Sequence, residues 1–113
     1  MSKIIFISSP YSHSDDSVRI ENFKKVSKFV AELTSQGHVV MSPIVYGHTL
    51  LDYKEMPSDW EFWKNFCLTF LEKCDEMIVY KMEGWDRSRG VAEEIEFAKS
   101  KNIPIKFVEY QEF

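Results

Sequence analysis

The feature that most constrains the fold of this chain is the alternation of short apolar runs with longer amphipathic segments. Four apolar runs have the length of strands: 3–8, 38–42, 76–80 and 103–108. Three segments between them repeat apolar residues at helical spacing: 18–36, 60–74 and 90–100. Strands that alternate with helices are typical of a parallel sheet with helices on both faces. The sequence therefore predicts an α/β fold, a small Rossmann-like (flavodoxin-like) three-layer domain whose short parallel sheet has four to five strands.

Composition and charge narrow the class of protein. The 113 residues are 44% hydrophobic, which is enough for one domain over residues 1–113 with a sizeable core. The net charge of −4 argues against a binder of duplex nucleic acid, which usually presents a basic face. No run of about 18 apolar residues indicates a membrane span, and the start "MSKIIFISSP" is too short for a signal peptide. We expect a cytoplasmic protein with no membrane or nucleic-acid polymer as partner.

The segments that follow the predicted strands carry the polar side chains of a candidate binding crevice. They are "SSPYSHS", "SPIVYGH" and "KMEGWDRSRG", and they are rich in hydroxyl groups, histidine, tyrosine or tryptophan. Ligands of parallel α/β sheets bind beyond the carboxyl ends of the strands, so we expect these segments to meet there. Residues 43–58 are predicted to be a long irregular loop, and Ser58 and Asp59 are predicted caps of the helix that follows.

The two cysteines are expected to be free thiols. Cys67 and Cys74 lie seven positions apart. In one helix this separation is about 10.5 Å, whereas a disulfide spans at most roughly 7 Å. Neither cysteine has His or Cys partners at the spacing of a zinc site, so we expect no metal, and no cofactor is implied.

The last predicted helix contains three glutamates, one of which faces the core. With about 100° per residue, Glu94 falls on the same side as Val91 and Ala98. Glu93 and Glu96 point outwards. A carboxyl group that faces the interior must be paired, hydrogen-bonded or functional. Glu94 is therefore a candidate catalytic residue, and a structural hydrogen bond to a neighbouring loop is the alternative.

The segment "DRSRG" before this helix is a candidate anion site. Ser88 is expected near the N-cap, where free backbone N–H groups and the helix dipole favour negative charge. Arg87 and Arg89 could add positive charge. The alternative is that Asp86 or Ser88 only caps the helix, which is a common arrangement.

Four segments together resemble the nucleoside 2-deoxyribosyltransferase superfamily: "FISSPYS", "VVMSPIVYGH", "CDEMIVY" and "SRGVAEEIEFA". The resemblance covers about residues 3–107, its most specific part is S-x-G-x-x-x-E-x-x-x-A, and the "GWDRSRG" loop points to small, poorly characterised bacterial and phage members. It implies that Glu94 is the nucleophile, which attacks the anomeric carbon of a 2-deoxyribosyl group while the base departs. Water or a second base then resolves the sugar–enzyme ester.

The resemblance also implies the partners. Members that act on free nucleosides tend to have an Asp six residues before the nucleophile, whereas relatives that hydrolyse deoxynucleoside 5′-monophosphates have a Ser, and this chain has Ser88. The candidate substrate-binding residues are Ser8, Ser9, Tyr11, His48, Asp86, Ser88 and Gly90. Trp60 and Trp85 are candidates for stacking on the base or for packing. Family members assemble as oligomers, so a homodimer or higher homo-oligomer is implied, with the aromatic-rich helix at 60–74 as the candidate interface.

Two positions depart from the family pattern. Phe6 stands where the family has a Tyr that hydrogen-bonds the catalytic glutamate, and Cys67 stands where it has an Asp that helps to protonate the departing base. Candidate substitutes for this acid are Asp59, Glu61, Asp86 and His48. The first hypothesis is an N-glycosidase that hydrolyses the base–sugar bond of (deoxy)nucleoside 5′-monophosphates. The alternatives are base exchange between nucleosides and a non-catalytic nucleotide-binding or sensing module, which Phe6 and Cys67 favour.

Overall fold

The computed structural model describes residues 2–113 and has a four-stranded parallel sheet at its centre. The strands are β1 Ile4–Ser8, β2 Val39–Met41, β3 Glu76–Lys81 and β4 Ile105–Glu109. Their order is β2-β1-β3-β4, and every neighbouring pair is parallel. The two central strands are covered on both faces, which explains why they are continuous apolar runs in the sequence. The predicted α/β three-layer fold with a short parallel sheet is confirmed.

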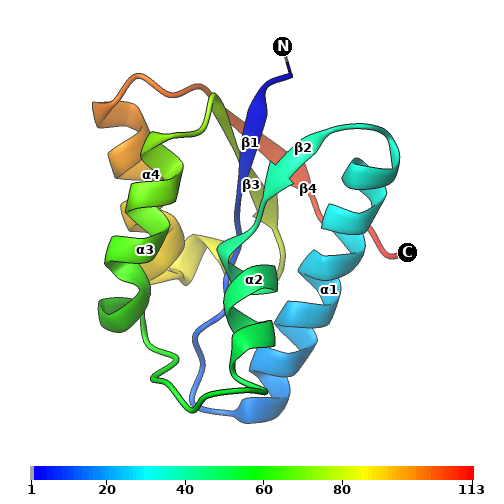
Figure 1. The fold of residues 1–113 in the computed structure, drawn as a ribbon, viewed down its shortest axis with the longest axis vertical. Helices are drawn as coiled ribbons and strands as arrows, with labels where there is room; N and C mark the ends of the chain where they lie inside the picture. The colour runs from blue at the N-terminus through cyan, green and yellow to red at the C-terminus, as the bar shows by residue number, and fades with distance from the viewer. Residues whose placement is uncertain (1) are drawn as a thin grey trace.

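Helices pack on both faces of this sheet (Figure 1). They are α1 Asp16–Ser35, α2 Pro43–Leu50, α3 Trp60–Glu72 and α4 Arg89–Ser100, and a short 3-10 helix, η1, covers Trp85–Arg87. One face of β1, with Ile5 and Ile7, packs against α1. The opposite face, with Phe6, packs against α3 and α4. Because successive strand residues point to opposite faces, this alternation divides the core into two layers.

Helix α2 was predicted as part of an irregular loop, and that prediction is wrong for residues 43–50. Pro43 stands in the first turn, and the hydroxyl of Ser42 accepts a hydrogen bond from the Val45 N–H at 3.3 Å, so the helix has a standard N-terminus. Gly47, which suggested a loop, is instead a packing residue. A Cβ atom there would lie 3.0 Å from the ring of Trp63 in α3. Tertiary contact with Trp63 therefore explains a glycine that local propensity would place outside a helix.

The predicted capping of α3 is also corrected. Asp59 occupies the N-cap position, but its side chain makes no capping hydrogen bond. Ser58 contributes its backbone carbonyl, which accepts a hydrogen bond from the Ser12 hydroxyl at 3.0 Å. The segment before α3 is therefore held through its backbone carbonyls, by Ser12 of the loop after β1 and by the indole N–H of Trp63, which donates to the Pro57 carbonyl at 2.9 Å. Cys67 and Cys74 are both buried free thiols.

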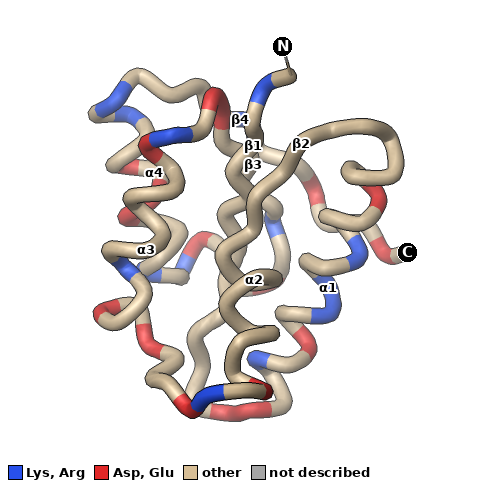
Figure 2. The backbone as a smooth tube through the Cα atoms, in the orientation of Figure 1, with Lys and Arg blue, Asp and Glu red and all other residues tan. Residues whose placement is uncertain are grey.

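The helices and the exposed side chains of the described residues relate to two expectations, which concern a membrane span and a subunit interface. Among the helices of residues 2–113, none combines the length and the hydropathy needed to cross a bilayer. Helix α2 has no Lys, Arg, Asp or Glu (Figure 2), and the aromatic side chains of Tyr46, Phe62 and Phe70 on α2 and α3 are exposed. The subunit interface predicted on α3 stays a prediction.

Replacing Gly37 with Ala is expected to destabilise the protein by about 1 kcal/mol. Gly37 ends α1 with φ of 94°, and its N–H and that of His38 donate to the carbonyls of Thr34 and Leu33 at 3.0 and 3.1 Å. Since an added Cβ meets no atom within 4 Å, only the left-handed backbone would oppose the change. Urea unfolding measures the effect, and Gly37→Asn, which tolerates this conformation better, should cost less. Equal stability of the Ala variant and the wild type would contradict this view of the turn.

Candidate active site

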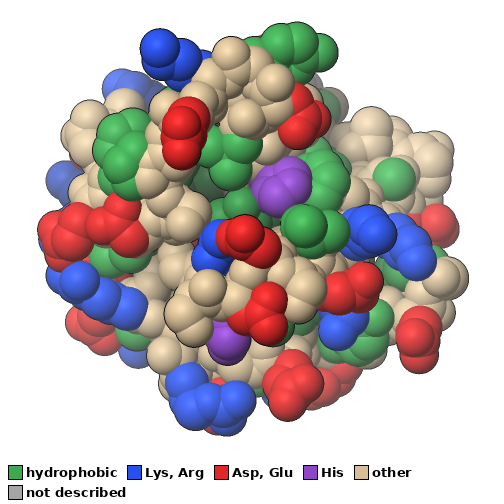
Figure 3. Space-filling view, turned by 90° about the horizontal axis from the view of Figure 1, so that it is seen from below, with side chains coloured by type: hydrophobic (Ala, Val, Ile, Leu, Met, Phe, Trp, Pro, Cys, Tyr) green, Lys and Arg blue, Asp and Glu red, His purple; other side chains and the backbone are tan. Residues whose placement is uncertain are grey.

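A cavity of about 250 Å³ lies at the carboxyl ends of the strands. All three segments predicted to form the crevice contribute to it: residues 9–12 after β1, residues of α2 after β2, and residues 87–90 after β3. The N-terminal half of α3 closes another side with Trp60 and Trp63. Figure 3 looks onto this end of the molecule and shows a hollow bordered by hydrophobic side chains and a histidine. The predicted meeting of the three segments is confirmed.

Glu94 reaches this cavity from the inner face of α4. Its exposed fraction is 5%, and the hydroxyl of Ser8, at the end of β1, donates a hydrogen bond to its Oε1 atom at 2.6 Å. Glu93 is paired with Arg89 and Lys64 at the edge of the helix, and Glu96 is exposed. The prediction that Glu94 is the inward glutamate is confirmed.

The environment of Glu94 favours its protonated form. Burial raises the pKa of Glu94 to about 8, although the hydrogen bond from Ser8 and the neighbouring thiol of Cys67 act in the opposite direction. At pH 7 only about one carboxyl group in ten is then ionised. A positive charge that develops beside such a carboxyl group favours its ionisation. A positive charge of this kind develops on the anomeric carbon of a sugar when the bond to the base breaks.

Ser8 takes the place of the hydroxyl expected at Phe6. Phe6 is fully buried in the core between the sheet and α3, whereas Ser8 lies two residues further along β1 on the same face. With an exposed fraction of 1%, Ser8 stands behind Glu94 and does not line the cavity itself. Its observed role is to hold the carboxyl group. Glu94 therefore has a hydroxyl donor, Ser8, although Phe6 itself has no hydroxyl group.

Cys67 of α3 is the second partner of the Glu94 carboxyl group. Cys67 lines the cavity, and its thiol lies beside the Glu94 carboxyl group, whose pKa it lowers. Burial raises the pKa of Cys67 far above its ordinary value, and the neighbouring carboxylate raises it further. Cys67 is therefore a neutral thiol over the whole physiological range.

The N-terminus of α4 forms a polar wall of the cavity. Ser88 is the N-cap, and its hydroxyl accepts a hydrogen bond from the Val91 N–H at 3.2 Å while it lines the cavity. Gly90 lies against Trp60, whose ring would be 3.1 Å from an added Cβ. The hydroxyl of Ser9 is buried, lines the same cavity and has no hydrogen-bond partner among residues 2–113. Capping and a cavity-facing position are thus combined in Ser88.

The two arginines beside this wall differ in how strongly other side chains bind them. Arg89 is bound to Glu61 and Glu93. Arg87 is exposed at the cavity and has Asp86 at 3.7 Å as its ion-pair partner. Asp86 itself is exposed and does not line the cavity, so the structure does not bring this predicted contact to the site.

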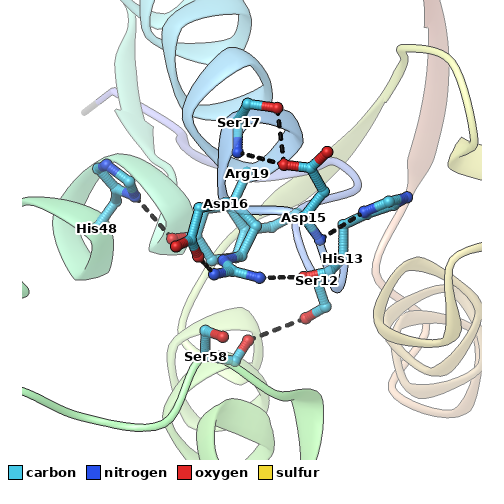
Figure 4. Close-up of polar contacts among 9 residues, drawn as sticks. Ser12, His13, Asp15, Asp16, Ser17, Arg19, His48 and Ser58 are labelled. Carbon is cyan, nitrogen blue, oxygen red and sulfur yellow. Dashed lines mark hydrogen bonds and ion pairs between the residues drawn. The ribbon is translucent and has the colours of Figure 1, made fainter.

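Tyr11 and His48 form a hydrogen-bonded pair on the other side of the cavity. The Tyr11 hydroxyl and His48 Nδ1 are 2.6 Å apart, and the imidazole stacks on Phe23 of α1 with a centroid distance of 4.1 Å. Burial raises the pKa of Tyr11 and lowers the pKa of His48. Figure 4 shows His48 beside the loop after β1. Arg19 of α1 donates to the His13 carbonyl of this loop and pairs with Asp16 of its own helix.

Sequence reasoning missed the apolar side of the cavity. Ile44 of α2, Leu51 at the C-cap of α2 and Trp63 of α3 line it. Their apolar spacing in the sequence is that of ordinary core residues, so no local signal marks them as site residues. Because residues 43–58 were assigned to a loop, Ile44 and Leu51 were not predicted to lie on a packed helical segment beside the cavity.

The fold and the cavity together define an α/β protein with a buried carboxyl group at a cavity beyond the carboxyl ends of the strands, and a solved structure shares this fold. The 2-deoxyribosyltransferase of the psychrotolerant bacterium Bacillus psychrosaccharolyticus superposes with a TM-score of 0.66 at 22% sequence identity, over 94% of this chain and 72% of that chain. At this identity the likeness establishes the fold. The chain matches over residues 3–111 the family described as "Domain of unknown function (DUF1937)", and it belongs to that family. None of the curated proteins matches it.

Proposed function

We propose that this protein is an N-glycosidase that hydrolyses the base–sugar bond of (deoxy)nucleoside 5′-monophosphates, with Glu94 as the nucleophile. The observation that carries the proposal is a buried carboxyl group in a cavity whose wall includes the N-terminus of α4. A nucleophilic carboxylate and an anion site in one cavity match the anomeric carbon and the phosphate of a sugar 5-phosphate. The fold shared with a 2-deoxyribosyltransferase supports chemistry of the same class.

Ionised Glu94 would attack C1′ of the sugar while the bond to the base breaks. The product of this step is a sugar ester of Glu94, which water then hydrolyses. Ser8 holds one carboxyl oxygen, so the other oxygen is left for the attack. The positive charge that develops on the sugar stabilises the carboxylate at the moment of reaction, which offsets the effect of burial.

The wall around Ser88 supports a substrate with a 5′-phosphate. The first N–H groups of a helix have no partners within the helix, and their dipoles favour an anion. The unpartnered Ser9 hydroxyl and the exposed guanidinium of Arg87 add donors at the same cavity. A carboxylate in the place of Ser88 would repel this phosphate.

The direct test is the release of free base, followed by chromatography. The substrates are ribo- and deoxynucleoside 5′-monophosphates together with the matching nucleosides. Faster release from the monophosphates supports the proposal. Release from nucleosides that depends on an added second base would indicate base exchange instead.

Ser88→Asp is expected to lower kcat/KM for the monophosphate by about 100-fold, with little loss for the matching nucleoside. The reason is that a like charge facing the phosphate costs several kcal/mol, and each 1.4 kcal/mol is about tenfold in affinity. Steady-state kinetics on both substrates measures the ratio. Ala92→Asp adds the same charge to an exposed position of α4 and should leave the ratio unchanged. An equal loss on both substrates would show that Ser88 does not contact the phosphate.

A non-catalytic nucleotide-binding module is the second candidate. The specific observation in its favour is the pair of Glu94 and Cys67, since the pKa of each group is raised and both are mainly neutral at pH 7. Calorimetry that detects binding of a monophosphate without any release of base would favour this module over the glycosidase.

A further inference from the structure

A base that leaves a sugar needs a proton, and the cavity holds one histidine beside its apolar side. An unprotonated base nitrogen is a poor leaving group, and a positioned acid typically accelerates such a step by about 10²–10⁴-fold. Resting on the proposed function, we propose that His48 is the catalytic residue that protonates the departing base and that Tyr11 positions its imidazole ring.

The surroundings of His48 leave one nitrogen for the substrate. The Tyr11 hydroxyl occupies Nδ1 at 2.6 Å. The ring of Phe23 covers one face of the imidazole at 4.1 Å and 22° from parallel. These two contacts fix the position and the tilt of the ring, so Nε2 is the polar atom that remains for the cavity which His48 lines.

The apolar residues around His48 define where a base would lie. Ile44 and Leu51 belong to the same helical segment as His48, and Trp63 packs against Gly47, the residue before it. Flat aromatic ligands are bound by such surfaces, with a few polar groups fixing their orientation. The phosphate-binding wall at Ser88 comes from a different element, α4, so the cavity has an apolar side that carries the acid and a polar side that carries the anion site.

The other groups that line the cavity fit this role less well. The Cys67 thiol holds its proton too tightly, because burial raises its pKa far above the ordinary value. The guanidinium of Arg87 does not release a proton in proteins. Asp59 is exposed at the start of α3. His48 carries the imidazole among the lining residues, and imidazole ordinarily titrates near neutrality, although burial lowers the pKa of His48 from that value.

The proton inventory of the two steps is balanced. In the first step a bond forms between Glu94 and C1′, the C1′–N bond breaks, and its electron pair stays on the base. The proton on Nε2 of the His48 imidazolium passes to the base and leaves a neutral imidazole. In the second step water attacks C1′, its proton returns to His48, and Glu94 regains its carboxylate.

The groups that affect the protonation of His48 come from α1, from the turn after α2 and from the loop after β1. Burial lowers the pKa of His48, Asp52 after α2 raises it, and Arg19 of α1 lowers it again, while Tyr11 is the hydrogen-bond partner. The active form therefore has a protonated His48 and an ionised Glu94, whose pKa is about 8. The rate should pass through a maximum and decline on the alkaline side of pH 8.

The test compares a natural nucleotide with 4-nitrophenyl 2-deoxyribose 5-phosphate, whose leaving group needs no proton. For His48→Gln we expect kcat/KM on the nucleotide to fall by about 100-fold or more, a much smaller change on the nitrophenyl substrate, and a nucleotide rate that no longer declines above pH 8. Tyr11→Phe should show a weaker form of the same selective loss. His38→Gln, which changes a histidine at the opposite end of the sheet, is the control and should leave both rates unchanged.

Each other outcome overturns the proposal in a distinct way. Equal losses of His48→Gln on both substrates would show a binding role without proton transfer. A selective loss in Asp59→Asn but not in His48→Gln would assign the acid to Asp59. Cleavage of neither substrate by the wild type would remove the proposed function, and the acid with it, whereas cleavage of the nucleotide that depends on Glu94 but not on His48 would remove only the acid.

Discussion

Base release from a nucleoside 5′-monophosphate is expected to fall by about 10⁴-fold or more in Glu94→Gln, as it does when a nucleophile is removed from other enzymes. The amide has nearly the same shape and can still accept the hydrogen bond from Ser8, but it cannot form a stable ester with the sugar. Binding of the nucleotide should persist, because Ser88 and the α4 N-terminus are unchanged. Single-turnover kinetics with the purified variant measures the loss.

Glu96→Gln is the matched control, since it makes the same chemical change two residues away on the exposed face of α4. Its rate should equal that of the wild type. A Glu94→Gln variant that keeps more than about a tenth of the activity would show that another group attacks the sugar or that water is activated elsewhere.

The stability of the protein is expected to decrease as the pH rises from about 5 to 8. The pKa of Glu94 is raised from its ordinary value of 4.5 to about 8 by burial. Between these values the folded protein holds a proton that the unfolded chain releases, so raising the pH favours unfolding by at most about 1.4 kcal/mol per pH unit. Below pH 4.5 both states are protonated and the contribution of Glu94 is fully retained.

Urea unfolding of Glu94→Gln at several pH values tests this linkage. The amide does not titrate, so the variant should lack this slope and exceed the wild type by an amount on the order of 5 kcal/mol at pH 8–9. Near pH 4 the two should differ little. The exposed Glu96→Gln control should keep the slope of the wild type, and an unchanged slope in Glu94→Gln would mean that the carboxyl group is ionised in the folded state.

Most of the correct predictions about the fold came from the spacing of apolar residues along the chain. The strand runs, the helices α1, α3 and α4 and the inward face of Glu94 all depend on residues a few positions apart, and that spacing is visible in the sequence. Helix α2 was missed because its Pro43, Gly47 and His48 have a low intrinsic preference for helix. Its helical form depends on the cap at Ser42 and on contact with Trp63.

The candidate site was predictable where it depends on position relative to the strands. Residues after parallel strands must share one edge of the sheet, so Ser9, Tyr11 and Ser88 could be named before the structure was known. Asp86 was named by the same reasoning, but the turn of η1 exposes its side chain. The direction in which a loop side chain points is set by the turn, which the pattern of the sequence does not specify.

The sequence by itself determined the alternation of the four strands with α1, α3 and α4, the parallel sheet and the one buried glutamate of α4, because each of these follows from short-range spacing. Only the tertiary structure decided what surrounds that glutamate. The Ser8 hydroxyl that holds it lies 86 positions away in the chain, and Tyr11 and His48 are 37 positions apart. Contacts of this length depend on how the helices pack on the sheet, so spacing along the chain carries no record of them.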